Sequence, residues 1–242
     1  MKKMTKLTFV LILLLIGTTN AVAQWGKKIK GDGNITTKTI KTADYDRIDV
    51  VGSMDVVLER GSEGTIEVTT DNNIHEYVTI ESNGGTLKIK IKNNVSLKTK
   101  KGIHITVPFE SISEVSLVGS GDIVGKDAIT GDSFEVSVTG SGDISLEVEA
   151  LRVDAKVTGS GDLALKGEAQ EFEVKVSGSG DFEGRSLKCE NAQAYVSGSG
   201  DAEVYVKNSL KARVNGSGDI RYDGNPSTRD TKVMGSGTIK SM

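Results

Sequence analysis

Carboxylates and hydroxyls that recur in one short motif are the residues with the clearest capacity for chemistry. The tetrapeptide Gly-Ser-Gly-Asp begins at Gly119, Gly140, Gly159, Gly178, Gly198 and Gly216, and a last copy at Gly235 carries Thr238 in place of the aspartate. Successive copies begin 21, 19, 19, 20, 18 and 19 residues apart. So constant a period predicts one structural unit that repeats along an axis and displays a row of serines and a row of aspartates.

Three roles are open to this row of aspartates. Carboxylates stacked about 4.8 Å apart repel by about 0.9 kcal/mol per pair even in water, so the repulsion must be offset. The structural role is that each carboxylate accepts a hydrogen bond from a turn N–H group or from the adjacent serine. The functional roles are to hold calcium between repeats or to contact a ligand such as a glycan directly. Calcium prefers six to eight oxygen ligands, whereas each copy supplies one carboxylate.

Direct contact would use the hydroxyl and carboxyl side chains of the middle copies. These candidate binding residues are Thr139, Ser141, Asp143, Thr158, Ser160, Asp162, Ser179, Asp181, Ser199 and Asp201. If strand alternation continues through the motif, they form a flat outward face, and the glycines point inward. A missing side chain there lets the wall bend and lets adjacent turns approach each other.

Catalytic and metal sites have little support. Catalytic residues must break a repeat, and these aspartates are the repeat itself. The only histidines, His75 and His104, have no Cys or His at zinc-ligand spacing, and no motif supports a serine nucleophile. We therefore predict no catalytic residue, no metal site and no cofactor, and we expect the chain not to be an enzyme. The single cysteine, Cys189, is interpreted as a small buried residue rather than a reactive thiol.

The segments between the motifs have the two-residue period of half-buried β-strands. Apolar residues alternate at Ile144, Leu146 and Val148, and again at Leu151, Val153, Ala155 and Val157. Alignment of the copies gives columns of like residues; two positions before each motif stand Leu117, Val138, Val157, Val176, Val196, Val214 and Val233. Columns of this kind favour an all-β fold, a parallel β-helix or β-solenoid with repeats of about 19 residues. A meander of antiparallel hairpins is the competing architecture.

We divide the mature chain into residues 24–110, a less regular β-rich part, and residues 111–242, the solenoid repeats. In the first part, Asn83-Gly84-Gly85 predicts a tight hairpin turn. Gly52-Ser53-Met54-Asp55 is a degenerate copy of the later motif. The solenoid is therefore expected to begin near residue 45 and to be interrupted by an insertion.

Lysines form a basic strand face in the first part. The residues concerned are Lys88, Lys90 and Lys92, followed by Lys98, Lys100 and Lys101. One interpretation is a solvated face or an edge strand that lysines protect from unwanted pairing. The other is contact with an anionic surface such as lipopolysaccharide.

The beginning of the chain predicts export. Three lysines precede an apolar run at residues 7–16, and Ala21-Val22-Ala23 offers a cleavage site, so residues 1–23 read as a secretory signal peptide. The run is shorter than the roughly 20 residues of a spanning helix, so the mature protein is not expected to span a membrane. We expect it in the periplasm, on the outer surface or in the medium. Residues 111–242 carry 14 Lys/Arg and 21 Asp/Glu, which argues against nucleic acid as a partner.

Taken together, the motifs resemble those of the putative auto-transporter adhesin, head GIN domain proteins common in Bacteroidetes. The resemblance is carried by Gly31-Asp-Gly-Asn-Ile35, Val50-Val-Gly-Ser-Met-Asp55, Ile103-His-Ile-Thr-Val-Pro108, the serial Gly-Ser-Gly-Asp copies and Tyr222-Asp-Gly-Asn-Pro226. It implies an exported β-helical protein with an adhesin-like role, binding a cell-surface glycan or an envelope protein. The alternatives are a structural envelope protein that assembles with itself and a calcium-stabilised β-roll. Thr238 and the polar residues after it hint at a cap against self-stacking.

Overall fold

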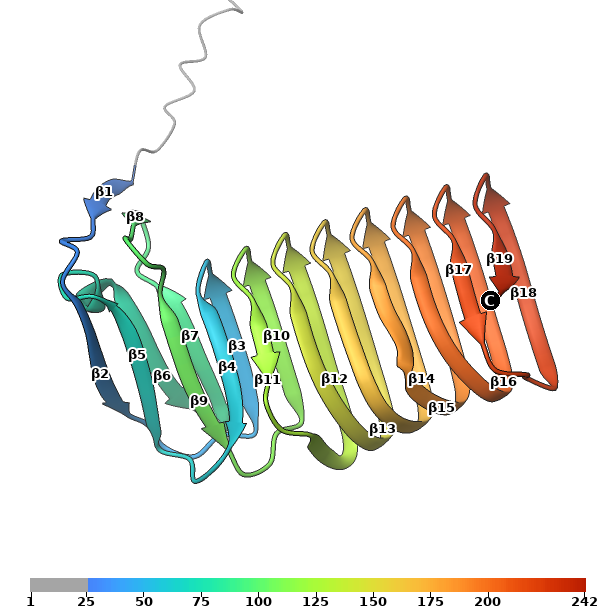
Figure 1. Ribbon diagram of the computed structural model, residues 1–242, viewed down its shortest axis with the longest axis horizontal. Helices are drawn as coiled ribbons and strands as arrows, with labels where there is room; N and C mark the ends of the chain where they lie inside the picture. Colours follow the sequence, from blue (N-terminus) through green and yellow to red (C-terminus); the bar gives the residue numbers. More distant parts are fainter. Residues whose placement is uncertain (1–25) are drawn as a thin grey trace, which may run out of the picture.

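The computed structural model describes residues 26–242, so the predicted signal peptide lies outside the described residues. The described chain is all-β, apart from one short 3-10 helix, and it forms an elongated row of stacked turns (Figure 1). We call each turn of the row a rung. The expected all-β solenoid is confirmed.

Ten elements make up the N-terminal part: β1 (Lys27–Lys30), β2 (Ile35–Lys41), β3 (Arg47–Gly52), β4 (Asp55–Arg60), β5 (Thr65–Asp71), η1 (His75–Tyr77), β6 (Val78–Asn83), β7 (Thr86–Ile91), β8 (Val95–Lys98) and β9 (His104–Phe109). The repeats form β10 (Glu114–Gly119), β11 (Ile123–Gly125), β12 (Ile129–Gly140), β13 (Ile144–Gly159), β14 (Leu163–Gly178), β15 (Phe182–Gly198), β16 (Ala202–Gly216), β17 (Ile220–Asp223), β18 (Thr228–Gly235) and β19 (Ile239–Ser241).

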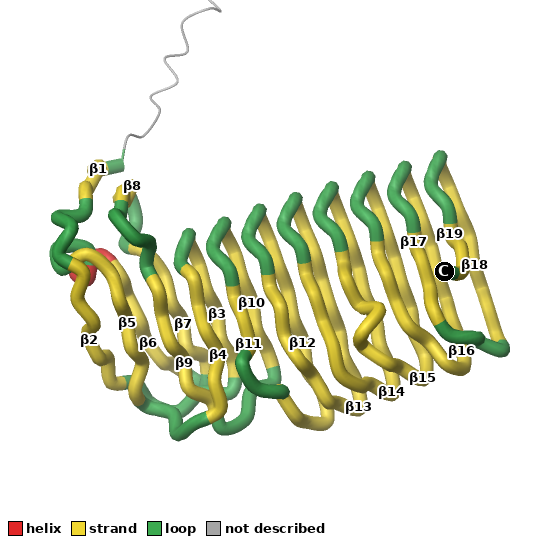
Figure 2. Tube along the Cα trace, in the orientation of Figure 1, coloured by secondary structure: helices red, strands yellow, loops and turns green. Residues whose placement is uncertain are grey.

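Neighbouring rungs run parallel and stay in register. Ala155 of β13 pairs with Val136 of β12 on one side and with Val174 of β14 on the other. The long strands β13 to β16 follow one side of the rung, turn at a broad bend and return along the other side (Figure 1). They end at tight loops, which Figure 2 shows as a row of tips along one edge. The antiparallel meander is therefore wrong for the repeats.

The core is the continuous apolar interior that the columns predicted. Val157, Val176 and Val196 are all buried, and the rings of Phe172 and Phe182 stack with centroids 5.3 Å apart. One assignment was wrong: Leu151 is 49% exposed, because it falls at the broad bend between the two sides of a rung. Strand alternation does not continue through such a bend, so the inward face resumes at Val153.

The expected early rung and insertion are confirmed. β3 pairs in parallel with β10 and with β7, and β4 pairs in parallel with β11 and with β9. The rung made by β3 and β4 therefore stacks directly on the first repeat, although 53 residues, 61–113, separate β4 from β10 in the chain. That insertion folds back to build the next rung outward, from β7 and β9.

Antiparallel strands close this end of the row. β6 and β7 form the hairpin predicted at Asn83-Gly84-Gly85, and both glycines have positive φ. β2 pairs antiparallel with β5, which pairs antiparallel with β9. A mixed sheet thus ends the stack where the parallel pattern stops.

Asp71 holds the loops of this end together. Its side chain is fully buried, and it accepts hydrogen bonds from the N–H groups of Gly33 (2.7 Å) and Lys100 (2.9 Å). These N–H groups, with that of Lys100 the strongest, hold the pKa of Asp71 below its ordinary value. The segment Gly31-Asp-Gly-Asn is therefore conformationally fixed by a carboxylate about 40 residues away in the chain.

The motif glycines are required by the close approach of the rungs. Gly159 has a φ of +116°, and a Cβ there would lie 2.3 Å from the carbonyl oxygen of Gly140. A Cβ at Gly161 would lie 2.1 Å from the carbonyl oxygen of Gly142. The approach of adjacent turns was predicted. The obstacle, however, is the backbone of the preceding rung rather than the apolar core.

Candidate functional site

The Gly-Ser-Gly-Asp tips lie one above the other and form one narrow edge of the row, which we call the ridge. It comprises residues 119–122, 140–143, 159–162, 178–181, 198–201 and 216–219. The carbonyl oxygen of Gly140 accepts hydrogen bonds from the N–H groups of Ser160 (2.8 Å) and Gly161 (3.1 Å) in the next rung. The same pair of bonds recurs from tip to tip, so backbone groups that a tight turn leaves unpaired are satisfied.

The aspartates form a hydrogen-bonded ladder along the ridge. Oδ1 of Asp143 accepts the N–H of Asp162 at 2.8 Å, and Oδ1 of Asp162 accepts the N–H of Asp181 at 2.8 Å. The bond recurs at each step from Asp122 to Asp219. The structural role expected for the carboxylates is thus confirmed, and these bonds offset the repulsion between like charges.

The last rung explains why Thr238 can replace an aspartate. The N–H of Thr238 donates to Oδ1 of Asp219 at 2.8 Å, as an aspartate would in that position. The hydroxyl and N–H of Thr238 hold the pKa of Asp219 below its ordinary value.

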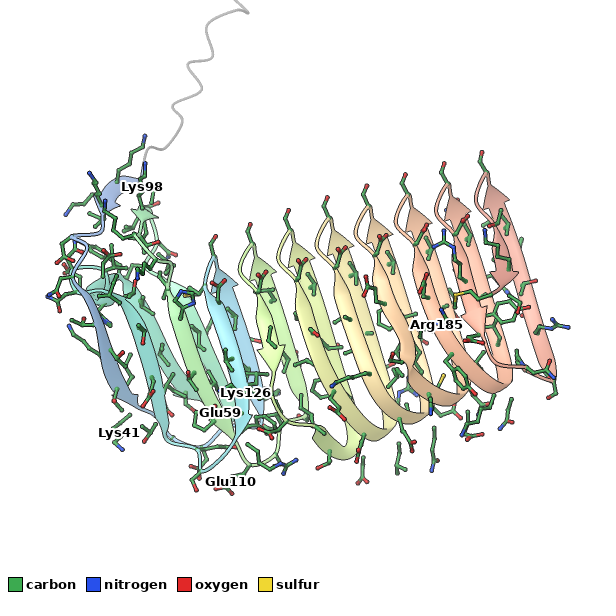
Figure 3. All side chains as sticks on the ribbon, viewed as in Figure 1. Lys41, Glu59, Lys98, Glu110, Lys126 and Arg185 are labelled. Atoms are coloured by element: carbon green, nitrogen blue, oxygen red, sulfur yellow. The ribbon has the colours of Figure 1, made fainter. Side chains whose placement is uncertain are left out.

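The structure brings all ten candidate residues together on or beside the ridge. The serines stand at the tips and are exposed, and Asp143, Asp162 and Asp181, which follow them, are exposed too. Of the two threonines that precede the tips, Thr139 is exposed, whereas the hydroxyl oxygen of Thr158 is buried and so is not displayed for a ligand. The expected flat face is therefore a narrow ridge, because the motif turns the chain sharply. Figure 3 shows side chains projecting from the tip of each rung.

The ridge carboxylates differ in whether an arginine pairs with them. Asp201 is engaged by Arg221 at 3.1 Å, and Asp219 lies 3.4 Å from the same guanidinium. The carboxylates from Asp122 to Asp181 form no ion pair within the described part of the chain. Their Oδ2 atoms and the ridge serine hydroxyls have no hydrogen-bond partner in that part either. Each of these rungs thus presents one hydroxyl donor and one carboxylate acceptor to the solvent.

A neighbouring depression was missed by the sequence argument. It has a volume of about 310 Å³ and lies on the side of the rungs that leads to the tips, lined by Lys175, Ser177, Tyr195, Ser197, Arg213 and Asn215 among others. The ring of Tyr195 lies 6.0 Å from the Lys175 ammonium and 5.7 Å from that of Lys211. The available signal was the single aromatic residue in an outward column of serines and cations, three positions before each motif.

The two histidines contact polar side chains, and the cysteine is buried. Nε2 of His75 lies 3.0 Å from Oγ1 of Thr36, and burial lowers the pKa of His75. Nδ1 of His104 lies 3.4 Å from Asp55. In residues 26–242 no group of three or more His, Cys, Asp or Glu side chains is placed to hold a metal. Cys189 is buried as expected, and burial raises the pKa of its thiol to about 12.

The lysines of the predicted basic face lie on or just after two separate strands, β7 and β8, and do not form one surface. Lys88 and Lys90 lie on β7, where Lys88 is directly opposite Asp49 and Glu81, and Lys90 lies 4.0 Å from Glu81. β7 is not an edge strand, since it pairs with β3 and β6. Lys98, by contrast, belongs to β8, which pairs only with β1 in a small parallel ribbon. Figure 3 shows Lys98 on this ribbon, apart from the row of rungs.

Nothing in the described residues would cross a membrane as a helix, because no helix there has the length or the apolar character.

Comparison with known proteins agrees with this architecture. The family described as "Putative auto-transporter adhesin, head GIN domain" matches residues 44–226, which is more than half of the chain. The match spans both the insertion and the repeats. No curated protein matches the chain.

Several solved structures share the fold. A putative adhesin from Bacteroides fragilis superposes with a TM-score of 0.85 at 23% identity, over 88% of this chain and 100% of that one. A protein described as a putative lipid binding protein from Parabacteroides distasonis gives a TM-score of 0.75 at 28% identity, over 89% and 100% of the two chains. A putative adhesin from the same organism gives 0.69 at 28% identity, with the same coverage.

Proposed function

Since the chain belongs to the putative auto-transporter adhesin, head GIN domain family, we propose that it is an exported, non-enzymatic binding module that recognises a cell-surface glycan or an envelope protein through its ridge. The description of the family names an adhesin head, and adhesion requires a displayed surface rather than a reactive centre. The proposed location is the periplasm, the outer surface or the medium, in keeping with the signal peptide predicted for residues 1–23.

The observation that carries the proposal is the repetition of unused polar groups along the ridge. Each middle rung offers an exposed serine hydroxyl and a carboxylate oxygen that is not committed to the ladder. Sugar hydroxyls are both donors and acceptors, so a donor and an acceptor on every rung suit a ligand that extends along several rungs. Because adjacent rungs lie about 4.8 Å apart, several weak contacts act together on one polymer.

A ligand along the ridge also explains why the aspartates are not neutralised over the whole ladder. Arg221 covers Asp201 and Asp219, whereas among the described residues no lysine or arginine forms an ion pair with the ridge carboxylates from Asp122 to Asp181. The first four carboxylates are accordingly the centre of the proposed site.

The test is binding of the mature chain to a printed array of bacterial surface glycans and to isolated cell-envelope fragments. The ridge variant is Asp162→Asn with Asp181→Asn. An asparagine Oδ1 still accepts the N–H of the next rung, so the ladder is retained while two carboxylates are removed. We expect the signal to fall about tenfold or more, since a hydrogen bond to a charged group contributes about 1.5–3 kcal/mol.

The matched control removes two exposed carboxylates from the broad bend, Glu149→Gln with Glu168→Gln. The control should bind as the wild type does. Equal binding by the ridge variant, or an equal loss in the control, would contradict a ridge site. A wild-type mature chain that sizes as a concentration-dependent polymer and binds neither array nor envelope would favour the self-assembling envelope protein instead.

A further inference from the structure

The β1–β8 ribbon carries an unusual arrangement of charge. The two strands pair in parallel with Lys30 directly opposite Lys98 and Lys28 directly opposite Ser96. Alternation places Lys28, Lys30, Ser96 and Lys98 on one face of the ribbon, and all four are exposed. Ile29 and Leu97, on the other face, pack against the core. One face is therefore anchored, and the other presents lysines to the solvent.

Lysine opposite lysine on adjacent strands destabilises the pairing. Two unit charges about 4.8 Å apart repel by about 0.9 kcal/mol even in water. A two-stranded sheet is itself only marginally stable, so the ribbon is a poor place for such a pair unless an anion uses it. Nothing in the fold requires lysine at either position, because both side chains point away from the protein.

Nearby carboxylates of the described chain do not neutralise the pair of Lys30 and Lys98. Among the described residues, no ion pair joins Lys30, Lys98 or Lys101 to a carboxylate. Asp71 is buried and its oxygens accept N–H groups, and Oδ1 of Asp32 accepts the N–H of Asn34 at 3.0 Å. Lys27, Lys100 and Lys101 are also exposed on or just after the ribbon, so the positive charge extends around it.

The place of the ribbon in the molecule indicates the shape of the partner. It lies at the end of the elongated row where the N-terminal part closes the stack (Figure 1), and the repeats beyond carry 14 Lys/Arg against 21 Asp/Glu. A protein that binds a linear polyanion needs positive charge along its whole length. Here the ridge that runs along the row is acidic, which argues against such a partner. The ribbon projects from the edge that carries the tips, at the N-terminal end of the row (Figure 1). A compact basic patch at one corner of an acidic rod fits a flat anionic surface that this corner touches.

From this arrangement we infer that the β1–β8 ribbon is an attachment surface for an anionic lipid bilayer, with Lys30 and Lys98 contacting phosphate headgroups. Each lysine close to such a surface strengthens binding about fivefold. The attachment is independent of the ridge, which stays free for its own ligand.

The experiment uses the mature chain in sedimentation with vesicles of phosphatidylcholine alone or with one third phosphatidylglycerol. We expect binding only to the anionic vesicles, with loss of binding at 1 M salt, where the screening length falls to about 3 Å. The variant Lys30→Gln with Lys98→Gln should bind about 25-fold more weakly. The control Lys156→Gln with Lys232→Gln, which removes two exposed lysines from the solenoid, should bind as the wild type does.

Several outcomes would overturn the inference: equal loss in both variants, binding to neutral vesicles, or binding to duplex DNA with none to anionic vesicles. Thermal unfolding of each variant checks its fold. Should the double glutamine variant unfold, Lys98→Glu places a carboxylate opposite Lys30, which favours the strand pairing and lowers the charge of the ribbon by the same two units. That variant must also lose vesicle binding. If it does not, the ribbon is not the attachment surface.

Discussion

At the scale of single residues, the two carboxylate oxygens of the repeated aspartate have different roles, one structural and one proposed for binding. Oδ1 accepts the N–H of the next rung, at 2.8 Å between Asp162 and Asp143, and Oδ2 is left for the solvent or a ligand. The structural role therefore does not compete with the proposed binding role. The motif can be retained throughout the stack for its backbone geometry and still present a repeated acceptor at the surface.

Asp71 makes the most specific prediction at this scale. Its folded-state pKa lies below the ordinary value of 3.8, so its stabilising contribution is present above that pH and is lost as the pH falls toward the folded-state value. Asp71→Asn removes the charge that two N–H groups stabilise. We expect the variant to be less stable than the wild type at pH 7 and to lose less stability between pH 5 and pH 2.

Urea unfolding at several pH values measures this difference directly. Other carboxylates titrate in the same window, among them Asp219 and Asp230, whose pKa values are also lowered. The comparison is therefore the difference between wild type and variant at each pH. A constant difference across the range would show that Asp71 does not carry a pH-dependent contribution.

At the scale of elements, the tip is an arrangement that only glycine permits. Gly161→Ala would place a Cβ 2.1 Å from the Gly142 carbonyl oxygen, and neither rung can move without breaking the ladder. We expect a loss of about 3 kcal/mol or more in the free energy of unfolding, at the upper end of overpacking effects.

The matched substitution is Gly131→Ala, where the nearest atom to a Cβ would be the Ser133 carbonyl oxygen at 3.9 Å. This position is exposed and should change stability by less than about 0.5 kcal/mol. Chemical denaturation of both variants checks the contrast. Similar effects of the two substitutions would mean that rungs are free to separate at the tips, contrary to the close approach described above.

The repeats could be predicted from sequence because apolar residues recur at the same positions in successive copies, as in the column of one leucine and six valines that stands two positions before the motifs. Val157 and its equivalents identify the inward face without any knowledge of the partner strands. Leu151 was wrongly assigned to the inward face, because strand alternation does not hold through the broad bend. No residue type near Leu151 indicates that the chain bends there. The narrow ridge was missed for the same reason: the alternation assumed through the motif is replaced by a sharp turn at glycines with positive φ.

The N-terminal part was less predictable because its pairings are set by distant contacts. The degenerate motif at Gly52 located an early rung and implied an insertion, but nothing local indicates that the insertion itself adds a further rung, in which β7 pairs with β3. The lysines from Lys88 to Lys101 were grouped by proximity in sequence. They separate because β7 is inside the sheet, whereas β8 leaves it to join β1.

At the scale of the whole molecule, the row is a modular rod with different chemistry on its edge and at its end. Each rung packs mainly against its neighbours. The free energy of unfolding and the length of the ridge therefore both increase with the number of rungs. The ridge repeats one donor and one acceptor per rung, and the basic ribbon is confined to one end. Removing a whole rung should therefore shorten the ridge without changing the architecture or the ribbon.

The most direct test of the central claim is ridge binding by a chain that lacks residues 160–178, in which Gly159 is joined to Ser179. The junction restores one Gly-Ser-Gly-Asp copy and removes one rung of 19 residues in register. We predict a folded, less stable protein that binds the same glycan-array spots about tenfold more weakly and binds anionic vesicles unchanged. Unaltered binding to the array by the folded, shortened chain would contradict recognition by the repeated ridge.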